Sequence, residues 1–128
     1  MSARSLLFAA LLLPLALLRP LARPPDFVGF ATFYGPGFEG RPTANGETFR
    51  YDAMTGAVDP YFRSQLMGQR VRVCSERACI VITINDICPE CAVNGVIVDL
   101  PDPAFALLGD VEQGRIFVKV WRINEPFQ

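Results

Sequence analysis

The chain has 128 residues, which is enough for one ordinary domain and too few for two. It contains no histidine, so a Ser-His-Asp or Cys-His relay is excluded, and an enzyme of this sequence would move protons with carboxylates. Without the two arginines of residues 1–22 the net charge is about −3, which argues against a nucleic acid or an anionic membrane as partner and fits a glycan.

The first 22 residues have the pattern of an export signal. A short basic start is followed by a run of Leu and Ala over residues 5–18. Roughly 13 apolar residues match the core of a signal peptide, whereas a membrane span needs about 20. We expect residues 1–22 to be a signal peptide, or alternatively an uncleaved anchor, followed by a linker at 23–26 and one domain at 27–124.

Short β-type segments dominate the rest of the chain. The segments with strand-like composition or alternating polarity are 27–34, 69–74, 79–84, 96–100 and 115–123. Residues 35–47 are a Gly- and Pro-rich loop, 51–68 are expected to form turns or one brief helix, and 102–108 a helix that Gly109 ends. Six short strands and one small helix without an internal repeat favour a compact barrel over a sandwich.

Asp86 is singled out by its setting. Ile80, Ile82 and Ile84 alternate toward one face, and Asp86 has the same parity, so we expect an acid at the end of a buried row. Apolar surroundings favour the protonated carboxyl, which suits a general acid. The alternative interpretation is that Asp86 only caps the Cys-Pro turn that follows it.

Four cysteines in an exported domain predict two disulfides, for which three pairings are possible. We favour Cys74–Cys79 and Cys88–Cys91 because each pair flanks a short turn. The rival interpretation is a four-thiolate zinc site, which the Cys-x-x-Cys spacing allows. A redox role is disfavoured because no βαβ pattern surrounds the motif. We expect no metal and no cofactor.

Six short motifs occur together in one order. They are Gly29-Phe30-Ala31-Thr32-Phe33-Tyr34-Gly35, Thr43-Ala44-Asn45-Gly46-Glu47, Ala53-Met54-Thr55, Gly68-Gln69-Arg70-Val71-Arg72-Val73, Ile84-Asn85-Asp86 and Val98-Asp99-Leu100. With them the sequence resembles the RlpA-like (rare lipoprotein A) double-psi β-barrel family, which is related to expansins, barwin and family-45 glycoside hydrolases. The resemblance covers residues 27–123. It implies a mainly β fold, a six-stranded double-psi β-barrel with one or two short helices and an open groove.

The resemblance also implies an activity and a set of site residues. Bacterial members include peptidoglycan lytic transglycosylases, in which the muramyl 6-hydroxyl attacks the anomeric carbon and leaves a 1,6-anhydro product. The family's functional acids correspond here to Glu47 and Asp86, which we expect to be catalytic. Tyr34, Thr43, Asn45 and Thr55 are expected to bind the sugar by stacking or hydrogen bonding.

One departure from the family pattern keeps other functions open. A histidine that follows the Ala-x-Thr segment in those enzymes is missing, since residues 56–59 are Gly-Ala-Val-Asp. A non-catalytic, expansin-like module that binds glycan or loosens the wall is therefore the second hypothesis, and the Cys88–Cys91 loop is similar to the expansin branch. A small secreted inhibitor of barwin type is the third. We expect an exported monomer whose partner is peptidoglycan or another wall glycan, without nucleic acid.

Three further side-chain interpretations complete the prediction. Asp99 is expected to have a structural role, ending a strand and holding a loop. Phe33 and Tyr34 point to opposite faces of their strand, so at most one of them faces the groove. Phe117 and Trp121 share parity on the last strand and are expected in the core.

Overall fold

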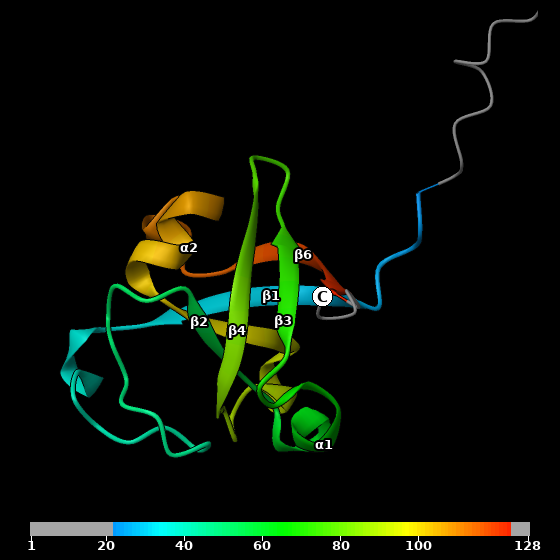
Figure 1. The fold of residues 1–128 in the computed structure, drawn as a ribbon. Helices are drawn as coiled ribbons and strands as arrows, with labels where there is room; N and C mark the ends of the chain where they lie inside the picture. Colours follow the sequence, from blue (N-terminus) through cyan, green and yellow to red (C-terminus); the bar gives the residue numbers. More distant parts are fainter. Residues whose placement is uncertain (1–21, 124–128) are drawn as a thin grey trace, which may run out of the picture.

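The computed structural model describes residues 22–123, and within them six strands close into a barrel in the order β1-β5-β2-β4-β3-β6 (Figure 1). The strands are β1 (Phe27–Tyr34), β2 (Thr55–Val58), β3 (Arg70–Cys74), β4 (Cys79–Ile87), β5 (Val96–Pro101) and β6 (Ile116–Arg122). Two neighbouring pairs, β1–β5 and β2–β4, are parallel, and the other pairs are antiparallel. The expected six-stranded barrel is confirmed.

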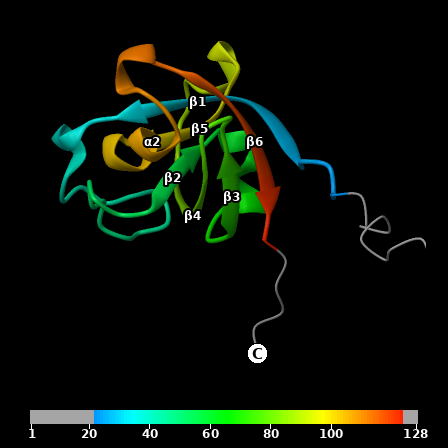
Figure 2. The ribbon, with the colours of Figure 1, turned by 90° about the horizontal axis from the view of Figure 1, so that it is seen from above.

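Two short helices flank the barrel. α1 (Arg63–Leu66) follows β2, and α2 (Asp102–Leu108) follows β5 and packs against the barrel through the fully buried Phe105. Seen from above, α2 lies beside β1 and β2 (Figure 2). Four single 3₁₀ turns complete the elements of residues 22–123, at Pro36–Phe38, Pro60–Phe62, Ala92–Asn94 and Val111–Gln113.

The export segment lies almost wholly in residues 1–21, outside the residues that the structure describes. Among the helices within residues 22–123, none is long and apolar enough to cross a membrane.

β2 lies in the segment for which we expected only turns or a brief helix, so that prediction missed a strand. The strand has four residues, too few to show an alternating pattern, and Gly56 and Ala57 at its centre carry almost no side chain. Gly56 is required for packing, because a Cβ there would lie 2.8 Å from Cδ1 of Ile82. The brief helix does follow, as α1.

Alternation fills the barrel with aliphatic side chains. Ile80, Ile82 and Ile84 of β4 are buried as predicted, together with Val71 and Val73 of β3. Burying such a side chain contributes about 1.5–3 kcal/mol, so these rows are the main source of stability.

The prediction for the last strand was wrong. The inward residues of β6 are Ile116, Val118 and Val120, so Phe117 and Trp121 share the outer face of the barrel. Phe117 is 52% exposed and Trp121 half-buried. The two residues do share one face of the strand, as predicted. That face is the outer one, because the buried, inward-facing residues are Ile116, Val118 and Val120.

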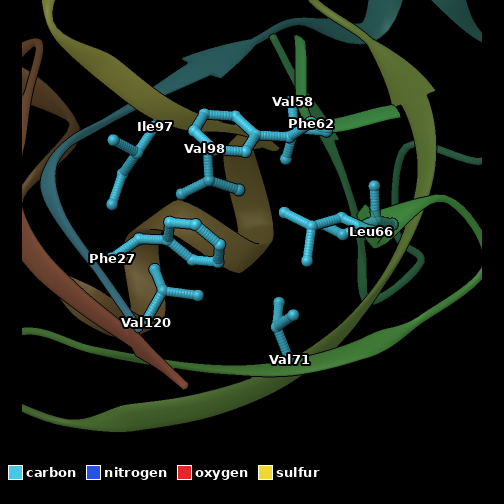
Figure 3. Close-up of a pocket in the computed structure, with 9 residues that line it drawn as sticks. Phe27, Val58, Phe62, Leu66, Val71, Ile97, Val98 and Val120 are labelled. Carbon is cyan, nitrogen blue, oxygen red and sulfur yellow. The ribbon is translucent and has the colours of Figure 1, made fainter. Parts of the chain in front are cut away.

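The interior leaves one small apolar space near α1 (Figure 3). It measures about 10 Å³ and is lined by aliphatic and phenylalanine side chains, among them Phe27, Phe62 and Leu66. A space of this size holds at most one water and offers it no polar partner, so the space is a packing defect and not a ligand site.

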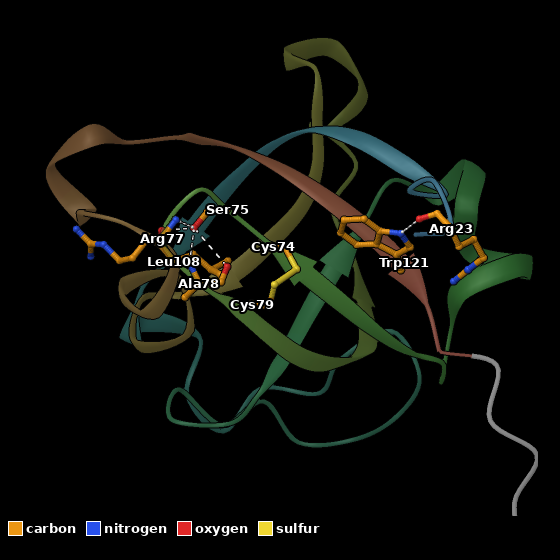
Figure 4. The surroundings of a disulfide bond; sticks show 8 residues. All are labelled: Arg23, Cys74, Ser75, Arg77, Ala78, Cys79, Leu108 and Trp121. Atoms are coloured by element: carbon orange, nitrogen blue, oxygen red, sulfur yellow. Dashed lines mark hydrogen bonds between the residues drawn. A yellow bond between two sulfur atoms is a disulfide. The ribbon is translucent and has the colours of Figure 1, made fainter. Parts of the chain in front are cut away.

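Both favoured disulfides are confirmed. Cys74–Cys79 joins directly opposite residues of the β3–β4 hairpin, with Cα atoms 4.0 Å apart (Figure 4). Cys88–Cys91 closes the turn after β4, with Cα atoms 5.4 Å apart. Each clips a short loop, so each restricts the unfolded chain by only about 2 kcal/mol.

Candidate functional site

A one-residue irregularity in β4 decides where Asp86 points. Gly56 of β2 pairs with Ile84, but the next residue, Ala57, pairs with Asp86, so Asn85 is the extra residue of a bulge. Asn85 takes the buried position and is 2% exposed, while Asp86 is half-buried on the outer face. The expectation that Asp86 continues the buried isoleucine row was wrong, because the bulge shifts the parity by one.

Four neighbouring strands present one row of side chains at this level. Asp86 of β4 and Asp99 of β5 both pair with Ala57 of β2, and Asp99 pairs in turn with Thr32 of β1. Directly paired residues project to the same face of a sheet. Thr32, Asp99, Ala57 and Asp86 therefore form one line on the outer face, which we call the groove row.

The groove row separates two carboxyl groups by the smallest side chain that still has a Cβ. Neighbouring strands lie about 4.8 Å apart, so the Cα atoms of Asp86 and Asp99 lie roughly 10 Å apart. Ala57 itself is only 3% exposed, so the accessible part of the groove row consists of Thr32, Asp86 and Asp99, which are half-buried.

Asp99 has the more perturbed environment of the two acids. Its carboxyl accepts a hydrogen bond of 2.8 Å from the Thr32 hydroxyl. Burial raises the pKa of Asp99 to about 6; the charges of Glu90 and Asp102 add to the rise, and the Thr32 hydrogen bond opposes it. Near pH 6 this group therefore exchanges a proton readily.

The Asp86 carboxylate is fixed by backbone donors. Its Oδ1 accepts hydrogen bonds from the N–H groups of Ala44, at 3.0 Å, and Ile87, at 2.9 Å. The first of these donors belongs to a distant loop and the second to the next residue of β4, so neither bond closes the Cys-Pro turn that Asp86 was expected to cap. The bond from Ala44 ties Asp86 to the loop that carries Glu47.

Glu47 lies beside Asp86 through two amide side chains. Its carboxylate accepts hydrogen bonds from Asn45 Nδ2, at 2.8 Å, and from the buried Asn85 Nδ2, at 3.3 Å. The backbone N–H of Asn45 also donates to the carbonyl of Asn85, at 3.3 Å. The two acids expected to be catalytic are therefore brought into one neighbourhood by adjacent residues of β4.

The expected sugar-binding residues divide into two groups. Thr43 is 6% exposed, and its hydroxyl donates to Asn45 Oδ1 at 2.7 Å, so it shapes the loop. Asn45 is exposed but already donates to Glu47. Tyr34 and Thr55 border the groove row, and within residues 22–123 their buried hydroxyl oxygens have no hydrogen-bond partner. Buried hydroxyls without partners are rare, and because both oxygens are closed off from solvent, a ligand could reach them only if neighbouring groups moved.

Tyr34 is electrostatically coupled to both acids of the groove row. Burial, and then the charges of Asp86 and Asp99, raise the pKa of its hydroxyl well above the usual value, so the hydroxyl stays protonated and able to donate. Phe33 points the other way and packs edge-on against Phe105, with ring centroids 4.9 Å apart. Tyr34 is therefore the groove-side ring of the pair.

An open cleft of about 490 Å³ extends from Asp99 toward the Cys88–Cys91 turn. Its lining residues include Thr32, Glu90, Asn94 and Arg115. The lining of the cleft combines apolar, neutral polar and charged side chains, so it could contact both neutral and charged parts of a polymer. Among residues 22–123 there is no group of three His, Cys, Asp or Glu side chains that could hold a metal.

Thr32, Asp99 and the ring of Phe38 were not among the site residues predicted from the sequence. Thr32 was only part of a motif, and Asp99 was expected to be structural; the signal for both was their shared place in the ordered motifs. Phe38, in the Gly- and Pro-rich loop, is 47% exposed and stacks edge-on against Tyr34 at 5.7 Å. No pattern identifies such a ring, because loop residues carry no periodicity.

Comparison with known proteins agrees with this fold. A family model described as lytic transglycolase matches residues 26–120. The probable endolytic peptidoglycan transglycosylase RlpA of Nostoc sp. is 42% identical over 99 residues, 74% of this chain and 25% of the relative. An uncharacterised Synechocystis protein is 35% identical over 73% of this chain and 94% of its own length. The chain spans about a quarter of the Nostoc relative.

Solved structures show the same barrel. A mutant of the Clavibacter michiganensis expansin in complex with cellohexaose aligns with a TM-score of 0.64 at 22% identity, over 79% of this chain and 52% of that one. The Streptomyces papain inhibitor aligns with a TM-score of 0.58 at 23% identity, over 77% and 98%. Together the family match and the barrel topology show that the chain belongs to the RlpA-like, double-psi β-barrel lytic transglycolase family.

Proposed function

We propose that this domain cleaves the MurNAc–GlcNAc bond of peptidoglycan as an endolytic lytic transglycosylase, with the reacting sugar over the groove row. One observation carries the proposal: two half-buried acids, Asp99 and Asp86, flank Ala57 on adjacent strands, and Asp99 has a pKa raised to about 6. A pair of acids in unlike environments is the usual basis of glycosidic bond cleavage.

The two acids take different parts in the reaction. Protonated Asp99 donates its proton to the glycosidic oxygen as the bond to the anomeric carbon breaks. Asp86, whose Oδ1 is held by two backbone N–H groups, is the acid placed beside the developing oxocarbenium ion. The muramyl 6-hydroxyl then adds to the anomeric carbon and gives its proton to Asp86 or Glu47. Exchange with solvent removes this proton and protonates Asp99 again.

This assignment differs from the one that the sequence suggested, which gave the acid role to Asp86. The environment favours Asp99 for that role, because burial raises its pKa to about 6. Glu47 stays a catalytic candidate beside Asp86. Tyr34 and Thr55 would donate hydrogen bonds to the sugar, and the exposed ring of Phe38 would contact its apolar face.

A second candidate function is a non-catalytic module that binds glycan in the same groove. The observation in its favour is that position 59, in the stretch where the family's enzymes carry a histidine, is the aspartate Asp59, which caps the Pro60–Phe62 turn by accepting from Tyr61 N–H. The likeness to an expansin that was solved with cellohexaose fits this function as well. For either function we propose that the protein acts outside the cytoplasm, which the two disulfides support, and that it acts as a monomer.

Digestion of purified peptidoglycan distinguishes the two functions. The enzyme proposal expects soluble products with 1,6-anhydromuramyl ends, detected by mass spectrometry, that disappear with Asp99→Asn and with Asp86→Asn. The exposed loop acid Asp52 offers a matched control, Asp52→Asn, which should leave the products unchanged. Binding to the insoluble wall without soluble product, by protein shown to be folded, would establish the non-catalytic module instead.

A further inference from the structure

The outer surface of β3 and β6 carries cations and one indole ring. Val71 and Val73 of β3 point inward, so Arg70 and Arg72 point outward. By the same alternation Lys119 and Trp121 lie on the outer side of β6. We call these four residues, with the Cys74–Cys79 disulfide between them, the β3–β6 face.

Strand register brings these side chains together. Arg72 lies directly opposite Trp121, and Cys74 lies opposite Lys119. Directly opposed residues have Cα atoms about 4.5–5.5 Å apart, so the guanidinium of Arg72 and the ammonium of Lys119 border the indole. Figure 4 shows Trp121 on the outer side of β6, with the Cys74–Cys79 disulfide on the neighbouring hairpin.

An open hollow of about 380 Å³ lies at this position. Its lining contains Arg23, Arg72 and Arg122 together with Trp121 and the disulfide, and it contains no acidic residue. The indole N–H donates to the carbonyl of Arg23 at 2.9 Å, which fixes the ring in place. The hollow thus has a held aromatic wall and a cationic rim.

The cations of the β3–β6 face are available for a ligand. Within residues 22–123 the ion pairs are Arg23–Asp26 and Arg50–Glu39, and neither involves Arg70, Arg72 or Lys119. All three side chains are exposed. The domain as a whole is acidic, so this positive face is a local feature and not a consequence of net charge.

The barrel order places this face away from the groove row. The groove row runs across β1, β5, β2 and β4, whereas β3 and β6 close the other side of the barrel. We propose that the β3–β6 face is a second binding site, for a carboxylate-bearing strand of the wall polymer, in which a pyranose ring stacks on Trp121 and carboxylates pair with Arg72 and Lys119. The site would hold the protein on the wall while the groove engages a neutral stretch of glycan.

The chemistry of the face favours an acidic glycan over other polyanions. Guanidinium groups pair with carboxylates in a planar, two-bonded geometry, and a fixed indole is a stacking surface for a sugar ring. The five cations of the face and its hollow, Arg23, Arg70, Arg72, Lys119 and Arg122, are fewer than the roughly 6–10 phosphate contacts of a strongly salt-dependent nucleic-acid complex. Binding to a bilayer requires apolar side chains that protrude from the surface, whereas the ring of Trp121 forms the wall of a hollow.

Binding to insoluble peptidoglycan tests the proposal. The probe is purified peptidoglycan that retains its stem peptides, measured by co-sedimentation in the Asp99→Asn background, so that turnover plays no part. We expect Arg72→Gln combined with Lys119→Gln to weaken binding at least tenfold at low salt and to remove its salt dependence. Arg77→Gln combined with Arg63→Gln removes the same charge from exposed positions elsewhere and should leave binding unchanged.

Two further measurements make the result decisive. Peptidoglycan whose carboxyl groups have been amidated should bind the original protein and the Arg72, Lys119 variant equally weakly. Trp121→Ala should weaken binding, and Trp121→Tyr should restore part of it, in proteins with unchanged circular dichroism. Equal binding by the charge variant and the original protein would overturn the proposal, as would equally tight binding to vesicles of anionic phospholipid. Neither result bears on cleavage in the groove.

Discussion

The two sides of the barrel have opposite charge and different construction. The groove side combines two parallel strand pairs, each with a one-residue register shift, and two half-buried acids, Asp86 and Asp99. The β3–β6 side is a plain antiparallel arrangement with strict alternation and exposed arginines. The comparison shows that regular pairing supplies the stable frame, whereas an irregularity in pairing is what turns a carboxylate out of the core and toward a substrate.

The largest expected effect is on the cleavage of peptidoglycan, which we assign to the groove side of the barrel. Asp99→Asn removes the proposed proton donor, so cleavage of peptidoglycan should fall at least about 100-fold. Cleavage by the original protein should also decline as the pH rises through about 6, because Asp99 then loses its proton. The Asp52→Asn variant should keep both the rate and the pH profile. A rate within threefold of the original for Asp99→Asn would exclude Asp99 as the acid.

The next effect tests the regular frame of the barrel. Ile82 of β4 is 1% exposed and its neighbour Val81 is 41% exposed. Ile82→Ala should lower the free energy of unfolding by about 3 kcal/mol, because it leaves a cavity in the core. Val81→Ala should change it by less than about 0.5 kcal/mol. Urea denaturation measures both values, and similar losses at the two positions would contradict the inward and outward assignment.

The two disulfides should differ in function although they resemble each other in stability. Replacing either pair by serines should lower the free energy of unfolding by about 2 kcal/mol, because each closes a short loop. Cys88 and Cys91 line the cleft beside Asp99, so their removal should also reduce cleavage. Removing Cys74 and Cys79 should leave cleavage by the folded fraction intact. If both double variants lost cleavage equally, the loss could not be assigned to the turn after β4, and the predicted difference between the two disulfides would be wrong.

A stability effect of similar size follows from the pKa of Asp99. Burial raises this pKa to about 6 from an unfolded value of 3.8, so the folded state binds a proton more readily than the unfolded state. The free energy of unfolding should therefore gain about 2 kcal/mol from this group as the pH falls from above 6 toward 4. Asp99→Asn should lack the gain. An unchanged pH dependence in this variant would show that Asp99 titrates normally.

The smallest effect concerns the hydrogen bond between Thr32 and Asp99. This bond stabilises the carboxylate, so Thr32→Val should raise the pKa of Asp99 by roughly one unit above 6. The side-chain carboxyl carbon of Asp99, followed by NMR across pH, gives the value directly. Thr32→Ser keeps the hydroxyl and is the matched control. A lower pKa in Thr32→Val would reverse the sign of the proposed interaction.

The regularly paired side of the barrel could be predicted from the sequence better than the groove side. Period-2 alternation located β3, β4 and the buried isoleucines, and the turn between Cys74 and Cys79 predicted their bond. The strand β2 was not predicted because its four residues are too few to show an alternation of polar and apolar side chains. The orientation of Asp86 was missed because a bulge adds one residue to the count, and only the paired strand shows where it lies.

The part of the site contributed by tertiary contacts could not be read from local sequence. Asp99 became a candidate through burial and the hydroxyl of Thr32, which is 67 residues away along the chain. Tyr34 was expected in the site from its motif, but its burial and the influence of the two acids on its pKa come from other strands. The ordered motifs located Glu47 and Asp86 in advance, and the structure placed them beside each other through Asn85.

Chemical-shift mapping with a soluble glycan strand is the most direct test of the groove. Short peptidoglycan strands without stem peptides, with their free lactyl carboxyl groups amidated so that the chain is neutral, are titrated into the isotope-labelled Asp99→Asn protein and report where a neutral sugar chain binds. We predict saturating amide shifts at Thr32, Ala57 and Asp86, with the amides of Arg72 and Lys119 unmoved. Shifts confined to the β3–β6 face, or no saturating shifts in the groove row, would contradict the assignment of the groove row as the substrate site.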